Sequence, residues 1–163
     1  MFRECINLKS VNFGKINASS LDQIRSLFYI CGSLESVDLS NFDTSSVTEM
    51  KWMFYKCCSL KSMKFPEGFN TSNVNSMFRV FYQCCSLISL NLSSFDATEV
   101  TDVGYMFYNC KNLKYLDIPH FSPINITSIR NMFESMISLI YLNIYSLEIN
   151  NDTNKVDAFK FLP

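Results

Sequence analysis

The sequence has little glycine, proline or histidine and no marked excess of charge of either sign. Four Gly and four Pro in 163 residues do not favour flexible linkers. Fourteen Lys and Arg residues face 15 Asp and Glu residues, for a net charge of -1. That balance provides no electrostatic footprint for nucleic acid or for an anionic membrane surface. No apolar run approaches the roughly 18 residues of a membrane-spanning helix, so we expect no membrane insertion by this segment.

Motifs for catalysis and cofactor binding are also missing. The sequence has no P-loop, GxSxG, HExxH or dinucleotide-binding fingerprint. Its one histidine, His120, follows Pro119 in a predicted turn, and no base with an orienting partner accompanies it. A zinc site is not favoured either, because no Cys-x-x-Cys pair is present. We therefore expect no enzyme activity, no cofactor and no metal.

What the sequence does contain is a repeat. The stretch from Leu34 to Cys57 returns almost intact from Leu87 to Cys110, and weaker copies fill the rest. The first leucine of each unit is Leu8, Leu34, Leu60, Leu87, Leu113 and Leu139. A period of about 26 residues indicates a solenoid. The one longer step contains Pro66-Glu67-Gly68, where a turn gains a residue.

Each unit opens with an L-x-x-L-x-L pattern, as in Leu34, Val37 and Leu39. The last two apolar positions alternate with polar ones, which predicts a strand. A bulky apolar residue follows in every unit: Ile16, Phe42, Phe69, Phe95, Phe121 and Leu147. A turn rich in Asn, Asp, Ser and Thr comes next. We expect the strands of successive units to pair in parallel.

The second half of each unit changes period. Met50, Met53, Phe54 and Cys57 stand at i, i+3, i+4 and i+7, the spacing of one face of a short helix. The two halves together predict an α/β solenoid, a right-handed superhelix of leucine-rich-repeat type with parallel strands on one face and short helices on the other. A helix this short should hold only by packing on the strand layer.

The predicted array of about six units covers residues 1–147. It begins inside a repeat, because Met1 to Cys5 matches Met53 to Cys57. Residues 148–163 depart from the pattern, with Asp152 at the position of Val47. We expect this tail to be a degenerate or shifted repeat, a C-terminal cap or a frayed end.

Two blocks carry a family resemblance. Asn41-Phe42-Asp43-Thr44-Ser45-Ser46-Val47-Thr48-Glu49-Met50 and Met53-Phe54-Tyr55-Lys56-Cys57-Cys58-Ser59-Leu60 resemble BspA-like leucine-rich repeats in their roughly 26-residue form. The similarity covers about residues 1–147. It implies a surface-displayed or secreted protein of a bacterium or protist that adheres to a host or extracellular-matrix protein. It brings no catalytic residues.

The strand positions that should face solvent are the candidate binding face, because concave solenoid faces are common binding surfaces. Four units present a serine there, and the last two present a tyrosine, a residue enriched at binding hot spots. The candidate residues are Asp38, Lys64, Asn91, Tyr115, Asp117, Tyr141 and Asn143. The alternative is a solvated face with no ligand, in a structural spacer that projects another domain.

Cysteines and aromatic residues recur at fixed repeat positions. Cys5, Cys31, Cys57, Cys84 and Cys110 share one position, which Met136 takes in the sixth unit. A buried column of small apolar side chains is the favoured interpretation, and disulfides between neighbours stay open on distance alone. Cys58 and Cys85 should be more exposed. Four tyrosines predict an aromatic stack over the helix seam: Tyr29, Tyr55, Tyr82 and Tyr108.

Overall fold

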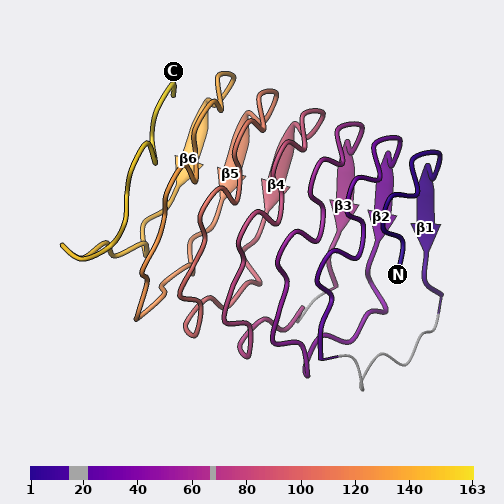
Figure 1. Ribbon diagram of the computed structural model, residues 1–163, viewed down its shortest axis with the longest axis horizontal. Helices are drawn as coiled ribbons and strands as arrows, with labels where there is room; N and C mark the ends of the chain where they lie inside the picture. The colour runs from indigo at the N-terminus through magenta and orange to yellow at the C-terminus, as the bar shows by residue number, and fades with distance from the viewer. Residues whose placement is uncertain (15–21, 67–68) are drawn as a thin grey trace.

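The computed structural model describes residues 1–14, 22–66 and 69–163, and this part of the chain is a parallel solenoid (Figure 1). It contains six strands of three residues: β1 (Ser10–Asn12), β2 (Ser36–Asp38), β3 (Ser62–Lys64), β4 (Ser89–Asn91), β5 (Tyr115–Asp117) and β6 (Tyr141–Asn143). Equivalent residues of successive repeats lie opposite one another, for example Val37 opposite Met63. Each repeat is one turn of the solenoid, a rung, as the spacing of the leucines predicts.

The expected helices are wrong: the described residues contain none. Between Met50 and Cys57, alternate backbone N–H groups bond within the segment and to the next rung. The N–H of Phe54 donates to the carbonyl oxygen of Val80 at 2.9 Å, whereas the N–H of Met53 donates to that of Met50 at 3.2 Å. The segment is therefore a chain of tight turns held by a ladder between rungs.

The turn segments produce helical spacing without a helix. Their N–H groups bond three residues back at Met53, Cys57 and Leu60, so the chain turns every three to four residues. Trp52 and Lys56 have φ of 58° and 59°, a left-handed conformation that cannot continue an α-helix. The four residues predicted for the helix face, from Met50 to Cys57, are nonetheless all buried. The inward face was predicted correctly, and the backbone beneath it was not.

A column of phenylalanine rings runs through the core. Phe28, Phe54, Phe81, Phe107 and Phe133 are fully buried. Successive rings stack with centroids 5.3, 5.7, 5.7 and 5.9 Å apart. The column continues to Phe2 at one end, 5.5 Å from Phe28, and to Phe159 at the other, 5.4 Å from Phe133. Each rung thus covers the apolar flank of its neighbour, which no rung could bury alone.

The strand layer is interrupted once. Strands β1 to β3 form one sheet and β4 to β6 another, and no ladder joins β3 to β4 in the described part of the chain. The interruption falls in the longer repeat, beside Phe65 and Pro66. Residues 67–68, which hold the predicted insertion, lie outside the described residues, as does Ile16 of the apolar position after the strand. The turn ladder crosses the interruption, with Glu49 bridged to Ser76 and Ser76 to Asp102.

The tail continues the solenoid. Asn154 bridges Ser128, and the N–H of Phe133 donates to the carbonyl oxygen of Ala158 at 2.9 Å. Ala158 is buried and Phe159 stacks on Phe133. Val156 takes the repeat position of Arg130, which is exposed, and is itself 57% exposed. Residues 153–161 therefore lie along the turn segment of the preceding rung, and Figure 1 shows this last stretch beside β6 at the C-terminal end.

Candidate functional site

The strand layer exposes two side chains per rung. The first and third residue of each strand face outward, while central residues such as Val37 and Leu116 face the core and are buried. This alternation follows from the two-residue period of a strand. Tyr115 and Tyr141 are paired in register on β5 and β6, and each is 50% exposed. The face is predominantly polar over β1 to β4 and carries its two tyrosines only on β5 and β6.

Three of the seven candidate residues already hold a turn. The Oδ1 atoms of Asp38, Asn91 and Asn143 accept hydrogen bonds from the backbone N–H two residues further on, at 2.8, 2.8 and 3.2 Å. The Ser40 hydroxyl and backbone N–H beside its carboxylate hold the pKa of Asp38 below its usual 3.8. These side chains form Asx-turns that end the strand, a structural role that the sequence analysis did not assign. Their recurrence as Asn or Asp at one repeat position was the available signal.

The other candidates divide by their contacts. Asp117 is half-buried and accepts a hydrogen bond from Asn143 Nδ2 at 2.9 Å, so it links two rungs. Lys64, Tyr115 and Tyr141 make no side-chain hydrogen bond within the described residues, and the charge of Lys64 helps to lower the pKa of Asp38. Of the predicted face, these three side chains are the ones that no hydrogen bond within the described residues engages.

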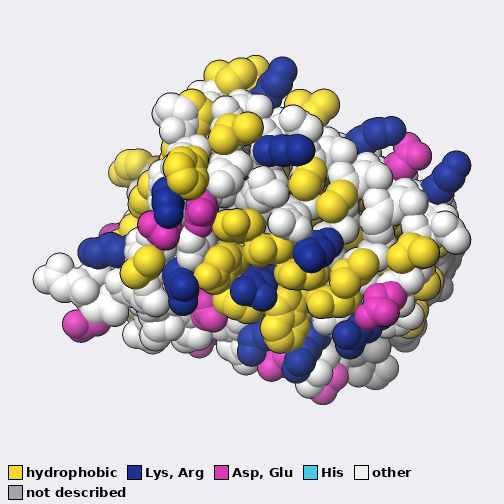
Figure 2. Space-filling view, turned by 45° about the horizontal axis from the view of Figure 1, so that its top comes forward, with side chains coloured by type: hydrophobic (Ala, Val, Ile, Leu, Met, Phe, Trp, Pro, Cys, Tyr) yellow, Lys and Arg dark blue, Asp and Glu magenta, His cyan; other side chains and the backbone are white. Residues whose placement is uncertain are grey.

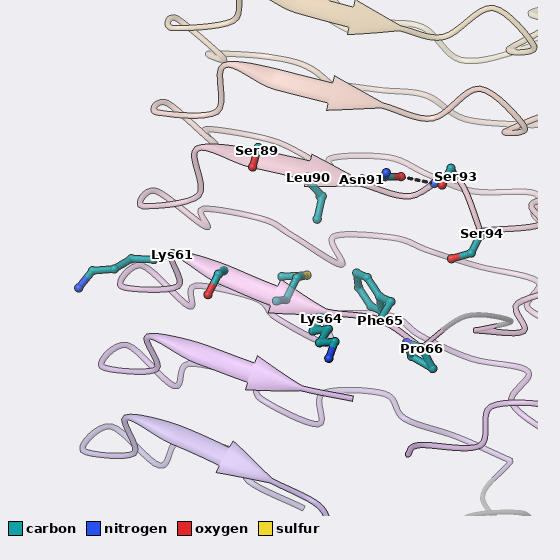
Figure 3. A pocket seen from close by; sticks show the side chains of 11 residues that line it. Lys61, Lys64, Phe65, Pro66, Ser89, Leu90, Asn91, Ser93 and Ser94 are labelled. Carbon is teal, nitrogen blue, oxygen red and sulfur yellow. Dashed lines mark hydrogen bonds between the residues drawn. The ribbon is translucent and has the colours of Figure 1, made fainter. Parts of the chain in front are cut away.

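A hollow opens where β3 and β4 fail to pair. It has a volume of about 430 Å³ and is bordered by Lys64, Phe65 and Pro66 on one side and by Ser89, Asn91 and Ser94 on the other (Figure 3). A second hollow of about 350 Å³ lies over β1 to β3. Two of the hollows on this molecule thus lie on the strand face that the sequence singled out.

The cysteine column forms as expected, with one added feature. Cys31, Cys57, Cys84 and Cys110 are buried and unbridged, whereas Cys5 is exposed. Each buried Sγ donates to a phenylalanine carbonyl oxygen of the preceding rung, as Cys57 does to Phe28 at 3.1 Å and Cys84 to Phe54 at 3.2 Å. Burial raises the pKa of Cys57, Cys84 and Cys110, so these thiols stay protonated. They are structural donors and not nucleophiles.

Among the described residues no three His, Cys, Asp or Glu side chains gather as a metal site would require. His120 is exposed. None of the helices that a bilayer crossing would need is found in residues 1–14, 22–66 and 69–163.

Rungs of about 26 residues with parallel strands define a leucine-rich-repeat-like solenoid, and one solved structure supports that class. A leucine-rich repeat protein from Bacteroides ovatus superposes with a TM-score of 0.55 and 20% identity over 85% of this chain. The chain spans about a third of that protein's length, 32%. A leucine-rich repeat protein of T. pallidum matches with a TM-score of 0.48 and 19% identity, covering 82% of this chain and 68% of its own.

The family model that matches is described as "Mycoplasma protein of unknown function, DUF285", and it matches residues 1–114 and 61–162. The chain belongs to this family. No curated protein matches the chain, and no enzyme family is evident among these comparisons.

Proposed function

We propose that the chain is a non-catalytic binding module that holds a protein ligand on its exposed strand face. The observation that carries this proposal is the pair Tyr115 and Tyr141. They lie in register on adjacent strands, each is 50% exposed, and neither makes a side-chain hydrogen bond within the described residues. Rigid aromatic side chains with a polar tip supply much of the binding energy at protein interfaces. Lys64, beside the hollow at β3 and β4, extends the same face.

We further propose that the protein is of the BspA-like kind and is displayed on a cell surface or secreted. The support is the recurring F-D-x-x-x-V-T and M-F-x-x-C blocks, of which Phe42 and Phe54 are buried members. The ligand is then a host or extracellular-matrix protein. Brief protease treatment of intact cells tests the location: the chain should be degraded while a cytosolic marker survives. A protein that survives with the marker would contradict display at the surface.

The ligand site is tested by substitution on the strand face. Purified chain is passed over immobilised fibronectin, laminin and collagen, and binding is measured by surface plasmon resonance. A Tyr115→Ser, Tyr141→Ser double variant should bind at least about thirtyfold more weakly, because a hot-spot side chain contributes about 2 kcal/mol or more. Tyr145→Ser is the matched control, since Tyr145 is 92% exposed but follows β6 instead of lying on it.

Two outcomes would contradict the proposal. If the double variant binds like the wild type, the ligand site is not on β5 and β6. If none of the three matrix proteins binds, and substitutions along the strand face leave the protein's role in cells intact, the chain is a structural spacer that projects another domain.

A further inference from the structure

The turn segments form a second surface, separate from the strand face. Tyr29, Tyr55, Tyr82 and Tyr108 stack face to face, with centroids 4.9, 4.7 and 4.8 Å apart. The guanidinium of Arg3 covers the open face of Tyr29, 4.8 Å from its centroid. The predicted tyrosine stack therefore exists, but it lies over turns and is closed at one end by a cation.

A second row lies beside the tyrosines and alternates rings with arginines. Trp52 meets Phe78 edge to face at 6.0 Å. Arg25 lies over the Trp52 ring at 4.8 Å, and Arg79 lies over Tyr105 at 4.7 Å. Lys and Arg side chains are seen directly among hydrophobic ones in the space-filling view of one face of the molecule (Figure 2).

Three of these arginines converge on one hollow. It has a volume of about 280 Å³, and its walls include Arg3, Arg25 and Arg79 together with Tyr29, Trp52 and Tyr55. We call it the arginine hollow. A hollow of this size lies at the lower limit for small-molecule sites, so it suits one small group instead of a whole folded partner.

The arginine hollow has more positive charge than the protein neutralises. Arg3 pairs with Glu4 at 3.1 Å, and Arg25 lies 3.9 Å from Glu49, which also faces Lys51 at 3.7 Å. Arg79 has no ion pair within the described residues. Its Nε is buried and has no hydrogen-bond partner. A buried donor on a cation normally has a partner, and a guanidinium fork fits a carboxylate or a tetrahedral oxyanion such as phosphate, whose geometry sulfate shares.

We propose that the arginine hollow binds the oxyanion of an acidic polysaccharide, a carboxylate or sulfate carried on a sugar ring. The Tyr29 and Tyr55 hydroxyls make no hydrogen bond within the described residues, so they are free to meet sugar hydroxyls. A nucleic acid fits less well. A base inserted between two stacked rings needs them about 7 Å apart, twice the van der Waals contact distance, and these rings are 4.7 to 4.9 Å apart.

Isothermal titration calorimetry with the wild-type chain separates the possible ligands. The probes are a heparin oligosaccharide, a hyaluronan oligosaccharide, neutral dextran and a short single-stranded DNA. Heparin supplies sulfate and carboxylate groups, and hyaluronan supplies carboxylate alone, so the two arms identify the oxyanion. We expect at least one acidic saccharide to bind and dextran not to bind. If neither acidic saccharide binds, or if the DNA binds more tightly than both, the proposal is wrong.

Substitutions locate the site. Arg79→Gln should weaken saccharide binding about tenfold or more, because a charge-assisted hydrogen bond is lost. Arg130→Gln is the matched control: it removes the same charge from above Tyr105 but lies outside the hollow, so binding should change less than about twofold. Arg25→Gln, at a side chain 51% exposed, tests the hollow again if Arg79→Gln fails to fold. Equal losses in the hollow variant and in Arg130→Gln would show unspecific attraction and overturn the proposal.

Discussion

At the scale of single residues, the seven cysteines differ in what they can do. Cys5 and Cys58 are exposed, Cys85 is half-buried, and the other four are buried. A thiol reagent attacks the thiolate, and burial raises the pKa of Cys57, Cys84 and Cys110. We expect Ellman's reagent to modify two thiols of the folded protein rapidly, a third slowly, and the remaining four only on unfolding. Rapid reaction of all seven would contradict the buried column.

Aspartates that hold turns should make stability depend on acid. Hydrogen bonds from the Ser45 backbone and side chain lower the pKa of Asp43, and the Thr98 side chain and backbone lower that of Asp96. Because these pKa values are lowered in the folded state, their stabilisation is complete above the ordinary value of 3.8. It is lost as the pH falls through the lower, folded-state values.

An Asp43→Asn, Asp96→Asn variant keeps both acceptors and cannot titrate. Urea unfolding at pH 6 and pH 2 should therefore show a smaller acid-induced loss in the variant than in the wild type. Parallel losses in the two proteins would assign the acid sensitivity to other groups.

At the scale of elements, the turn segment makes a prediction that a helix would not. Lys56 has a φ of 59°, and Lys51 on the same rung lies outside the positive-φ region. A non-glycine residue in the left-handed region costs about 1–2 kcal/mol. Glycine removes this strain, but its greater backbone entropy in the unfolded chain costs about 0.5–1 kcal/mol. Lys56→Gly should thus stabilise the protein by up to about 1 kcal/mol, and Lys51→Gly should destabilise it by about 0.5–1 kcal/mol. The check is the urea midpoint of each; a helix would make both variants less stable.

Side-chain periodicity in the sequence was enough to predict the strands and the inward-facing residues. The strands from Ser36 and Ser62, the parallel register and the inward residues from Met50 to Cys57 follow from which side chains must avoid water. Whether the backbone beneath Met50 is a helix or a series of turns depends on where its N–H groups bond. Those partners lie on the next rung, and one unit of sequence does not contain them. The same limit hid the approach of Arg79 to Tyr105, which lie on different rungs. The Asx-turn of Asp38 is different: its partner, the N–H of Ser40, is only two residues away, so the recurrence of Asn or Asp at this repeat position could have predicted it.

At the scale of the whole molecule, the strand layer is interrupted in the one repeat that is a residue longer than the others. The longer step between Leu60 and Leu87 coincides with the unpaired edges of β3 and β4. The turn ladder and the phenylalanine column continue across this point. The solenoid is therefore joined there through its core and turns and not through its strand layer, which leaves the hollow beside Lys64 open on the surface.

Substitution of Phe81 tests whether the core holds the solenoid together where β3 and β4 do not pair. It is fully buried, with Phe54 and Phe107 each 5.7 Å away, and its contact with Phe54 crosses the interruption of the strand layer. Phe81→Ala should cost about 3–5 kcal/mol, the usual range for a buried phenylalanine. Phe2→Ala should cost less, because Phe2 is only half-buried and stacks on one ring of the column, Phe28. In a repeat solenoid, the free energy of unfolding is the sum of the stabilities of the single rungs and of the interfaces between them. Phe81→Ala removes two ring contacts within the column, whereas Phe2→Ala removes one. Chemical denaturation of the two variants measures the difference, and equal losses would mean that the rungs do not support one another in this way.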